Sequence, residues 1–253
     1  MKFSCVNLEH TVFNRTLFQK LSAVFPENSL TGIIGPNGSG KTTLLKYLAG
    51  ITKPIKGNVY INNKDIHTFN NRERAKKNSY LPQNTFISYD LSVLEIVLLG
   101  RAAHQKYFSL WSDVDKKIAR ECLKAVQLDG FENREIKSLS GGEFQRVMLA
   151  RMLAGQTENL LLDEAITALD IKHSLAFLEL CKKLCENGKR IVLVIHQLEL
   201  AYRYCDNILL LGLKNGKSLF GETKKIMTKK NLTLAFEVMT KHEKDILSFY
   251  SAK

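Results

Sequence analysis

Short apolar runs alternate along the chain with segments in which apolar residues recur every three or four positions. Short runs bounded by turn residues are typical of the buried strands of a parallel sheet, and the wider spacing is typical of amphipathic helices. The alternation therefore predicts an α/β fold with a mostly parallel sheet. Strands are expected at Leu30–Ile34, Asn58–Ile61, Ser79–Leu81, Leu160–Leu162, Arg190–Ile195 and Asn207–Leu211.

Helical patterns replace the strand signals between about residues 88 and 154. One amphipathic helix is predicted there by four apolar residues at regular intervals, Val114, Ile118, Cys122 and Val126. We expect residues 1–253 to form a single domain. An α/β core over residues 1–87 and 155–222 would carry a helical subdomain over residues 88–154, and residues 223–253 would form a C-terminal helical extension.

The composition is that of an ordinary soluble globular protein, since 45% of the 253 residues are hydrophobic and 25% are charged. The N-terminal stretch MKFSCVNLEH lacks the apolar run of a signal peptide. No apolar stretch approaches the ~20 residues that a membrane helix needs. The five cysteines form no Cys-x-x-Cys pair, so we interpret them as thiols in the core or on a helix. These features indicate a reduced, cytosolic chain without a membrane span.

Lysine and arginine outnumber aspartate and glutamate by 37 to 25, which gives a formal net charge of +12. Two segments, Lys53–Lys77 and Lys214–Lys253, hold most of the excess. Such a charge suits nucleic acid, anionic lipid, a polyanionic ligand or simply a well-solvated surface. Composition does not choose among these partners.

The segment GPNGSGKT follows a predicted strand and precedes a helical pattern, which is the context of a phosphate-binding P-loop. Its glycines let the backbone curl so that successive N–H groups face one anion, and the helix adds its positive N-terminal end. Lys41 would bind the β and γ phosphates, and the Thr42 hydroxyl would ligate Mg²⁺. The expected nucleotide-binding residues are Gly35, Pro36, Asn37, Gly38, Ser39, Gly40, Lys41, Thr42 and Thr43.

A second apolar run, NLLLDE over residues 159–164, ends in two carboxylates. Asp163 would hold the hydrated Mg²⁺, and Glu164 would polarise a water for in-line attack on the γ phosphate. An isolated pair of this kind is often only a strand that meets its loop through two solvated acids. Beside a P-loop, the pair favours hydrolysis by water over transfer to a substrate hydroxyl.

The segment LSGGE, residues 139–143, resembles the LSGGQ signature of ATP-binding cassette (ABC) ATPases, and the resemblance extends from residue 3 to about residue 238. It implies a P-loop NTPase (RecA-like) core, an N-terminal antiparallel β-region, and ATP and Mg²⁺ as cofactors. It also implies that Ser140, Gly141 and Gly142 form a second anion site. A second copy of the chain would complete that site in an ATP-bound homodimer.

The same resemblance implies roles for three further residues. Gln83, in SYLPQ, would be a catalytic residue that reaches Mg²⁺ and the attacking water. Asp170, in TALD, would contact the opposite chain of the dimer, and His196 would sense the γ phosphate. The family usually has an acidic residue after this histidine, and here Gln197 takes its place.

The adenine is expected to stack on an aromatic ring that precedes the P-loop, because a ring face suits any purine. Phe13 is our choice, with His10 and Phe18 as competitors.

A second departure from the family is Ala165, which stands where a proline usually follows the catalytic glutamate.

Three stretches, residues 63–83, 91–115 and 196–206, are similar to the importer group for iron-siderophore, haem and cobalamin. The resemblance implies an ATPase at the cytoplasmic side of the inner or plasma membrane, bound to transmembrane permease subunits and serving, indirectly, a secreted or periplasmic substrate-binding protein. No nucleic acid partner is expected. The alternatives are a soluble ABC ATPase that acts on nucleic acid or in iron–sulfur assembly, and an importer for another cargo such as zinc or manganese.

Aromatic residues gather between Thr85 and Trp111, and we predict that this stretch docks a coupling helix of the permease. Charge reversal at Arg101 together with truncation of Phe86 would then uncouple hydrolysis from transport. The alternative explanation is that these aromatic residues pack inside the helical subdomain. For Trp111 taken alone, docking and core packing are equally supported by the sequence.

Overall fold

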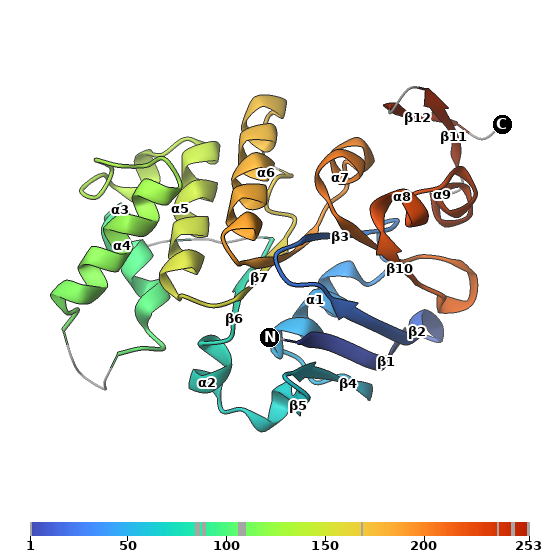
Figure 1. Ribbon diagram of the computed structural model, residues 1–253, viewed down its shortest axis with the longest axis horizontal. Coiled ribbons are helices and arrows are strands. Elements are labelled where there is room, and N and C mark those ends of the chain that lie inside the picture. Colours follow the sequence, from blue (N-terminus) through green and yellow to red (C-terminus); the bar gives the residue numbers. More distant parts are fainter. Residues whose placement is uncertain are drawn as a thin grey trace.

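The centre of the computed structural model is a six-stranded sheet with the strand order β10-β9-β3-β8-β7-β6 (Figure 1). The structure describes residues 2–83, 87, 90–105, 110–167, 169–236, 238–243 and 246–251. Neighbouring strands run parallel except for β10, which pairs antiparallel with β9. The strands are β3 (Leu30–Ile34), β6 (Asn78–Leu81), β7 (Asn159–Asp163), β8 (Arg190–Val194), β9 (Asn207–Leu210) and β10 (Leu219–Glu222). The predicted parallel sheet is confirmed.

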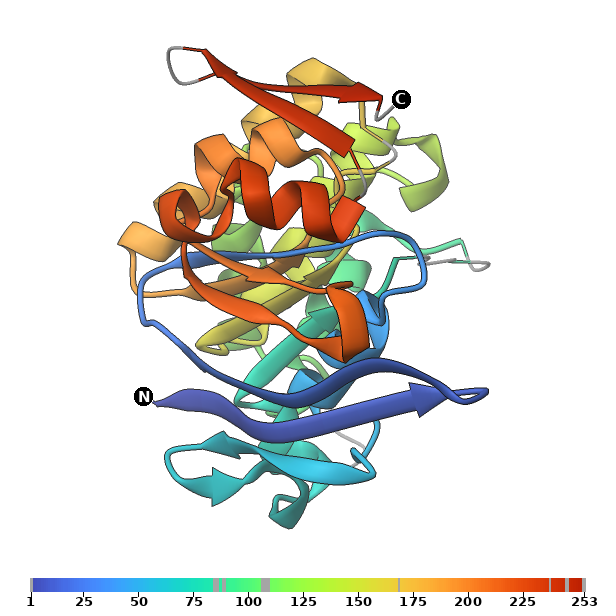
Figure 2. The ribbon, with the colours of Figure 1, turned by 90° about the vertical axis from the view of Figure 1, so that its right-hand side faces the viewer.

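A smaller antiparallel sheet has the strand order β2-β1-β4-β5. Its strands are β1 (Phe3–Val12), β2 (Arg15–Phe25), β4 (Lys56–Ile61) and β5 (Lys64–Asp65). Helix α1 (Lys41–Ala49) lies between the two sheets, where Leu44, Leu45 and Leu48 are fully buried in one apolar cluster with residues of both (Figure 2). The predicted strand at Asn58–Ile61 is therefore real but belongs to this second sheet, which confirms the expected N-terminal antiparallel region.

The helical subdomain lies at one end of the molecule, beyond β6 and β7 (Figure 1). It contains α3 (Val93–Leu98), η2 (Leu99–Arg101), α4 (Asp113–Ala125), η3 (Ile136–Ser138) and α5 (Gly141–Ala154). A serine caps each of the three α-helices, and an acidic residue three positions later closes a capping box with it. These local signals explain why the helices start at Val93, Asp113 and Gly141.

The buried face of α4 is displaced from the predicted apolar stripe. Ala119 and Leu123 are fully buried, whereas Val114 is 66% exposed. Residues four apart drift around a helix of 3.6 residues per turn, so a strict spacing of four leaves one face over four turns. The helix was predicted correctly, and the predicted stripe faces the core in part, since Val126 is fully buried and only Val114 is exposed.

The remaining elements pack around the two sheets or form the C-terminal segment. They are η1 (Ile66–Thr68), α2 (Asn71–Ala75), α6 (Ile171–Glu186), α7 (Leu198–Tyr204), η4 (Lys214–Gly216), α8 (Thr223–Ile226), α9 (Lys229–Phe236), β11 (Val238–Glu243) and β12 (Ile246–Ser251). In the described part of the chain, no helix is both long and apolar enough to cross a membrane.

The C-terminal segment is helical only as far as Phe236. Beyond it, β11 and β12 pair antiparallel as a hairpin, so the expected helical extension over residues 223–253 is wrong for this part. Valine, threonine, isoleucine and aromatic residues are frequent in the sequences VMTKHE and ILSFYS, and such residues favour strands over helices.

Candidate functional site

The P-loop connects β3 to α1 and wraps around its own lysine. The Nζ atom of Lys41 donates to the carbonyl oxygens of Gly35 at 2.9 Å and Pro36 at 3.0 Å. Burial lowers the pKa of Lys41, and the charges of Glu164 and Asp163 oppose that shift. A cation held by carbonyl groups alone is ready to exchange them for phosphate oxygens, which are stronger acceptors.

A glycine is required where the loop turns into α1. Gly40 is the N-cap residue and has a φ of 91°, a left-handed conformation that L side chains rarely adopt. A Cβ atom at this position would also lie 3.1 Å from Cε1 of Phe18. No side chain caps the start of α1, so the first N–H groups of the helix are available to an anion.

Two hydroxyl groups hold the buried carboxylate of Asp163. Thr42 Oγ1 donates to Oδ1 and Tyr80 Oη donates to Oδ2, each at 3.1 Å. Asp163 is 1% exposed, and its burial raises the pKa of the carboxyl group while the two hydrogen bonds oppose the shift. A hydroxyl and a buried carboxylate are hard oxygen donors of the kind that Mg²⁺ prefers, so the predicted pair fits this ion.

Tyr80 is a residue of the site that sequence reasoning missed. It lies in β6, which runs parallel to β7, and it is paired in register with Leu161, two residues before Asp163. Burial is the largest cause that raises the pKa of the Tyr80 hydroxyl, and the nearby Asp163 charge adds to it. The sequence offered one signal, a tyrosine in a predicted apolar strand shortly before Gln83. It did not show that this strand lies beside the strand that carries Asp163.

Glu164 contacts the two other residues predicted to be catalytic, Gln83 and His196. Its Oε2 accepts from Nε2 of Gln83 at 2.6 Å, and its Oε1 lies 2.7 Å from Nε2 of His196. The residue has a φ of 52°, in the left-handed region that is costly for a glutamate. The three side chains follow β6, β7 and β8, whose carboxyl ends share one edge of the sheet.

The signature residues form the first turn of α5. Ser140 and Glu143 make a capping box, in which the Glu143 carboxylate accepts from the backbone N–H of Ser140 at 2.8 Å and from its hydroxyl at 2.7 Å. These two hydrogen bonds hold the pKa of Glu143 below its usual value. Within the described residues, no hydrogen bond joins Ser140, Gly141 or Gly142 to the P-loop of the same chain.

Asp170 caps the following helix. Its Oδ1 accepts from the backbone N–H of His173 at 2.8 Å and lies 2.8 Å from Nδ1 of the same residue. Those contacts hold the pKa of Asp170 below its usual value. The side chain is 64% exposed, which leaves it accessible to a second copy. Of the segment 167–170, Ala168 lies outside the described residues.

Among the three aromatic candidates for the adenine, only Phe13 has an exposed ring. Phe13 lies in the turn between β1 and β2 and is 99% exposed, whereas Phe18 is fully buried. His10 contacts both Phe18 and Tyr47, each with ring centroids 5.7 Å apart. Stacking of the base on Phe13 stays a prediction.

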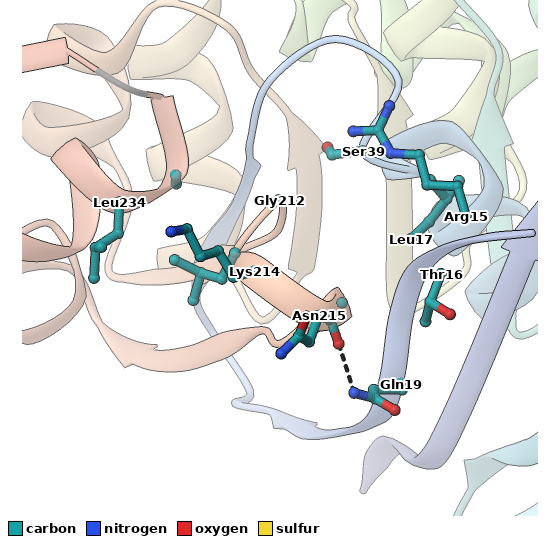
Figure 3. A pocket seen from close by; sticks show the side chains of 12 residues that line it. Arg15, Thr16, Leu17, Gln19, Ser39, Gly212, Lys214, Asn215 and Leu234 are labelled. Carbon is teal, nitrogen blue, oxygen red and sulfur yellow. Dashed lines mark hydrogen bonds between the residues drawn. The ribbon is translucent and has the colours of Figure 1, made fainter. Parts of the chain in front are cut away.

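A cavity of about 490 Å³ lies beside the P-loop, between β2, the loop after β9 and α9 (Figure 3). Arg15, Leu17 and Gln19 line it from β2, and Ser39 from the P-loop. The Oγ atom of Ser39 is buried without a hydrogen-bond partner in the described part of the chain. The cavity therefore extends the phosphate loop toward the turn that carries Phe13.

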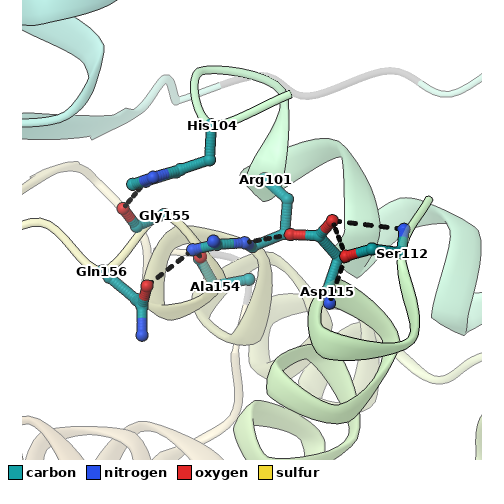
Figure 4. Close-up of polar contacts among 7 residues, drawn as sticks. All are labelled: Arg101, His104, Ser112, Asp115, Ala154, Gly155 and Gln156. Carbon is teal, nitrogen blue, oxygen red and sulfur yellow. Dashed lines mark hydrogen bonds and ion pairs between the residues drawn. The ribbon is translucent and has the colours of Figure 1, made fainter. Parts of the chain in front are cut away.

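Arg101 does not lie on a docking surface. It is 6% exposed, and its guanidinium donates to Asp115 Oδ1 at 2.9 Å, to the Ala154 carbonyl at 2.9 Å and to Gln156 Oε1 at 2.8 Å (Figure 4). The predicted contact of Arg101 with a permease is therefore wrong, because the side chain is used inside the subdomain. Phe86, the other residue of that prediction, lies outside the described residues.

The remaining aromatic residues between Thr85 and Trp111 were also expected to dock the permease. Trp111 is half-buried and packs against the main core, and Tyr89, Tyr107 and Phe108 lie outside the described residues.

Four cysteines are buried and all five are free, which confirms the interpretation as core or helix thiols. Within the described residues, no group of histidine, cysteine or acidic side chains could hold a metal ion without nucleotide.

Residues 18–167 match the family model described as ABC transporter. The chain is 38% identical over 231 residues to the hemin import ATP-binding protein HmuV of Rhizobium meliloti (strain 1021), which covers 88% of this chain and 86% of the relative. It is 37% identical over 227 residues to the iron(3+)-hydroxamate import ATP-binding protein FhuC of Bacillus subtilis (strain 168), which covers 89% of this chain and 84% of the relative.

Two solved structures have a similar fold. A chain of an ABC transporter assigned to the metal-chelate type, in an inward-facing conformation, has a TM-score of 0.83 and 29% identity over 98% of this chain and 95% of that one. The dimeric structure of MJ0796, a bacterial ABC transporter cassette, has a TM-score of 0.72 and 30% identity over 87% and 98% of the two chains. This chain therefore belongs to the ATP-binding cassette transporter family.

Proposed function

We propose that the chain is the ATP-hydrolysing subunit of an ABC importer for an iron chelate (a siderophore), haem or cobalamin. The observation that carries the proposal is the Glu164 carboxylate, held by Gln83 and His196 beside the Thr42–Asp163 pair. The import ATP-binding relatives and the metal-chelate transporter support the choice of cargo class.

ATP would bind with its phosphates in the P-loop and its base toward Phe13. Lys41 would exchange the carbonyl groups of Gly35 and Pro36 for phosphate oxygens, and the backbone N–H groups of residues 38–43 would face the same anion. Thr42 and Asp163 would hold Mg²⁺, with Gln83 approaching from β6. The ion neutralises charge on the β and γ phosphates when it is bound.

Glu164 would act on the attacking water. Both of its oxygens are engaged, one with Gln83 and one with His196, so the carboxylate has one orientation. A water that enters between them would meet a base already aimed at it, and general-base assistance of this kind lowers the barrier to in-line attack. His196 would hold the carboxylate and respond to the γ phosphate.

Hydrolysis would need a homodimer. Ser140 and Gly141 are exposed at the start of α5 and are not used by the chain's own P-loop. The N–H groups of Gly141 and Gly142 would receive the anion, and the Ser140 N–H would join them only after leaving the Glu143 carboxylate. The dimeric structure of MJ0796 supports the view that this fold can pair with itself. ATP held by the P-loop of one copy would then lie under Ser140, Gly141 and Gly142 of the other, with Asp170 at the interface.

The transport path would lie in separate permease subunits, with the cassette bound to their cytoplasmic side and a secreted or periplasmic substrate-binding protein delivering the cargo. The net charge of +12 suits a surface that faces anionic headgroups. The two basic segments contain no residue of the P-loop, the signature or the Glu164 group, although Lys214 and Leu234 line the cavity beside the P-loop. This position away from the catalytic motifs favours the membrane over nucleic acid as the reason for the charge.

The test is the purified chain and its Glu164→Gln variant, which keeps the shape of the site and removes the base. The variant should lose ATP hydrolysis and accumulate as an ATP-bound dimer in size-exclusion chromatography. Glu186→Gln, an exposed carboxylate at the end of α6, is the matched control and should hydrolyse ATP normally. Full activity in Glu164→Gln would refute the proposal, and a salt-sensitive complex with DNA would favour the nucleic-acid alternative.

A further inference from the structure

A histidine outside the recognised motifs contacts one of them through its ring nitrogen. His173 lies in the first turn of α6, and its Nδ1 atom is 2.8 Å from Oδ1 of Asp170. The backbone N–H of His173 donates to the same oxygen at 2.8 Å. The carboxylate of Asp170 therefore fixes both the start of the helix and the orientation of the imidazole.

The imidazole also lies against the signature. A Cβ atom at Gly142 would be 2.8 Å from Cδ2 and 3.1 Å from Cγ of His173. At these distances a side chain at position 142 would force the ring to move, so the backbone of α5 lies directly against the imidazole. His173 thus joins Asp170, after β7, to Gly142, at the start of α5.

Neither helix capping nor core packing explains this side chain. The capping bond uses the backbone N–H of residue 173, which every residue except proline supplies. The side chain is 41% exposed, so its burial contributes little to folding. What the imidazole adds is the contact between the two elements.

We propose that His173 is a positioning residue that holds Asp170 and the signature turn in one arrangement. The proposal rests on the homodimer of the proposed function, in which both elements meet the second copy. Elements held in their bound arrangement lose less freedom when the copies join, so the dimer forms more readily. Within the described residues, no hydrogen bond joins His173 to the P-loop, so ATP binding by the separate chain should not depend on it.

The experiment measures two constants in the Glu164→Gln background, which prevents ATP from being consumed. Sedimentation velocity in ATP gives the dimer dissociation constant, and a fluorescent ATP analogue gives the nucleotide affinity of the dilute monomer. His173→Ala should raise the dimer dissociation constant about tenfold, within the range of coupling between contacting residues. The nucleotide affinity should stay unchanged.

His173→Asn is the conservative variant, because its side-chain amide places a donor where Nδ1 stands and should restore most of the dimerisation. Lys183→Ala, an exposed residue later in α6, is the control and should behave like the parent. The proposal is overturned if His173→Ala dimerises as well as the parent, if it loses nucleotide affinity in parallel, or if Asn is as weak as Ala. A parent that stays monomeric in ATP would overturn the proposed function itself.

Discussion

The Nε2 atom of His196 lies 2.7 Å from the Oε1 atom of Glu164. Histidine follows β8 and the glutamate follows β7, its neighbour in the sheet, so the pair is set by two parallel strands that end at one edge. The Glu164 side chain is 13% exposed and that of His196 is 33% exposed. The contact can therefore be broken and remade from the solvent side without disturbing the core.

His196→Ala should lower kcat for ATP by about 100-fold, because Glu164 loses the partner that orients it toward water. ATP affinity should stay the same, since the phosphates bind to the P-loop. Steady-state hydrolysis and equilibrium binding of an ATP analogue measure the two quantities. Gln197→Ala is a matched control, as this exposed neighbour makes no side-chain cap hydrogen bond. An unchanged kcat in His196→Ala would contradict the role.

Tyr80→Phe should raise the Mg²⁺ concentration for half-maximal hydrolysis about tenfold, as removal of a group that orients a metal ligand commonly does. The change deletes one hydroxyl and leaves the hydrogen bond from Thr42 to Asp163 in place. Magnesium titrations of both hydrolysis and nucleotide binding provide the measurement. Tyr60→Phe, in β4, is the control, and equal Mg²⁺ dependence in the two variants would remove Tyr80 from the site.

Sequence reasoning located the parts of the site that local pattern determines. The P-loop has a turn that needs glycine, and β3, β7 and β8 are apolar runs buried along their whole length. Because parallel strands end at one edge of a sheet, residues that follow different strands are expected to lie close together. Gln83, Glu164 and His196 follow three such strands and are in contact.

What sequence reasoning missed depends on tertiary contacts between distant segments. Arg101 looked like a surface cation, but Asp115, Ala154 and Gln156 supply acceptors inside the subdomain, and only these make its burial possible. His173 carries no motif of its own. Its importance follows from the approach of Gly142, which the sequence does not reveal.

Arg101→Ala should lower the free energy of unfolding by about 3 kcal/mol, because it leaves Asp115 and two further acceptors without their buried donor. Urea unfolding followed by circular dichroism measures this. Arg120→Ala, exposed on α4, is the control and should change stability little. If Arg101→Ala lost transport while its stability stayed unchanged, the result would instead support the predicted contact of Arg101 with a permease.

His10 should make the fold sensitive to acid. Burial lowers the pKa of His10 below its usual value, so in the native state the ring takes up a proton less readily than in the unfolded chain. At pH values above about 6.5 both states are neutral and the full stability is present; as the pH falls below that, the unfolded state binds protons first and stability is lost.

His10→Asn should therefore reduce the loss of stability between pH 7.5 and pH 5.5, because the amide keeps a polar atom near the Tyr47 hydroxyl, 2.9 Å from Nδ1, and does not titrate. Burial lowers the pKa of His67 as well, so some acid sensitivity will persist until that residue is also replaced. Tyr47→Phe removes the hydrogen bond but keeps the titrating ring, and it should lower stability without abolishing the pH dependence. Equal acid sensitivity in His10→Asn and the unmodified chain would show that the native and unfolded states protonate His10 alike.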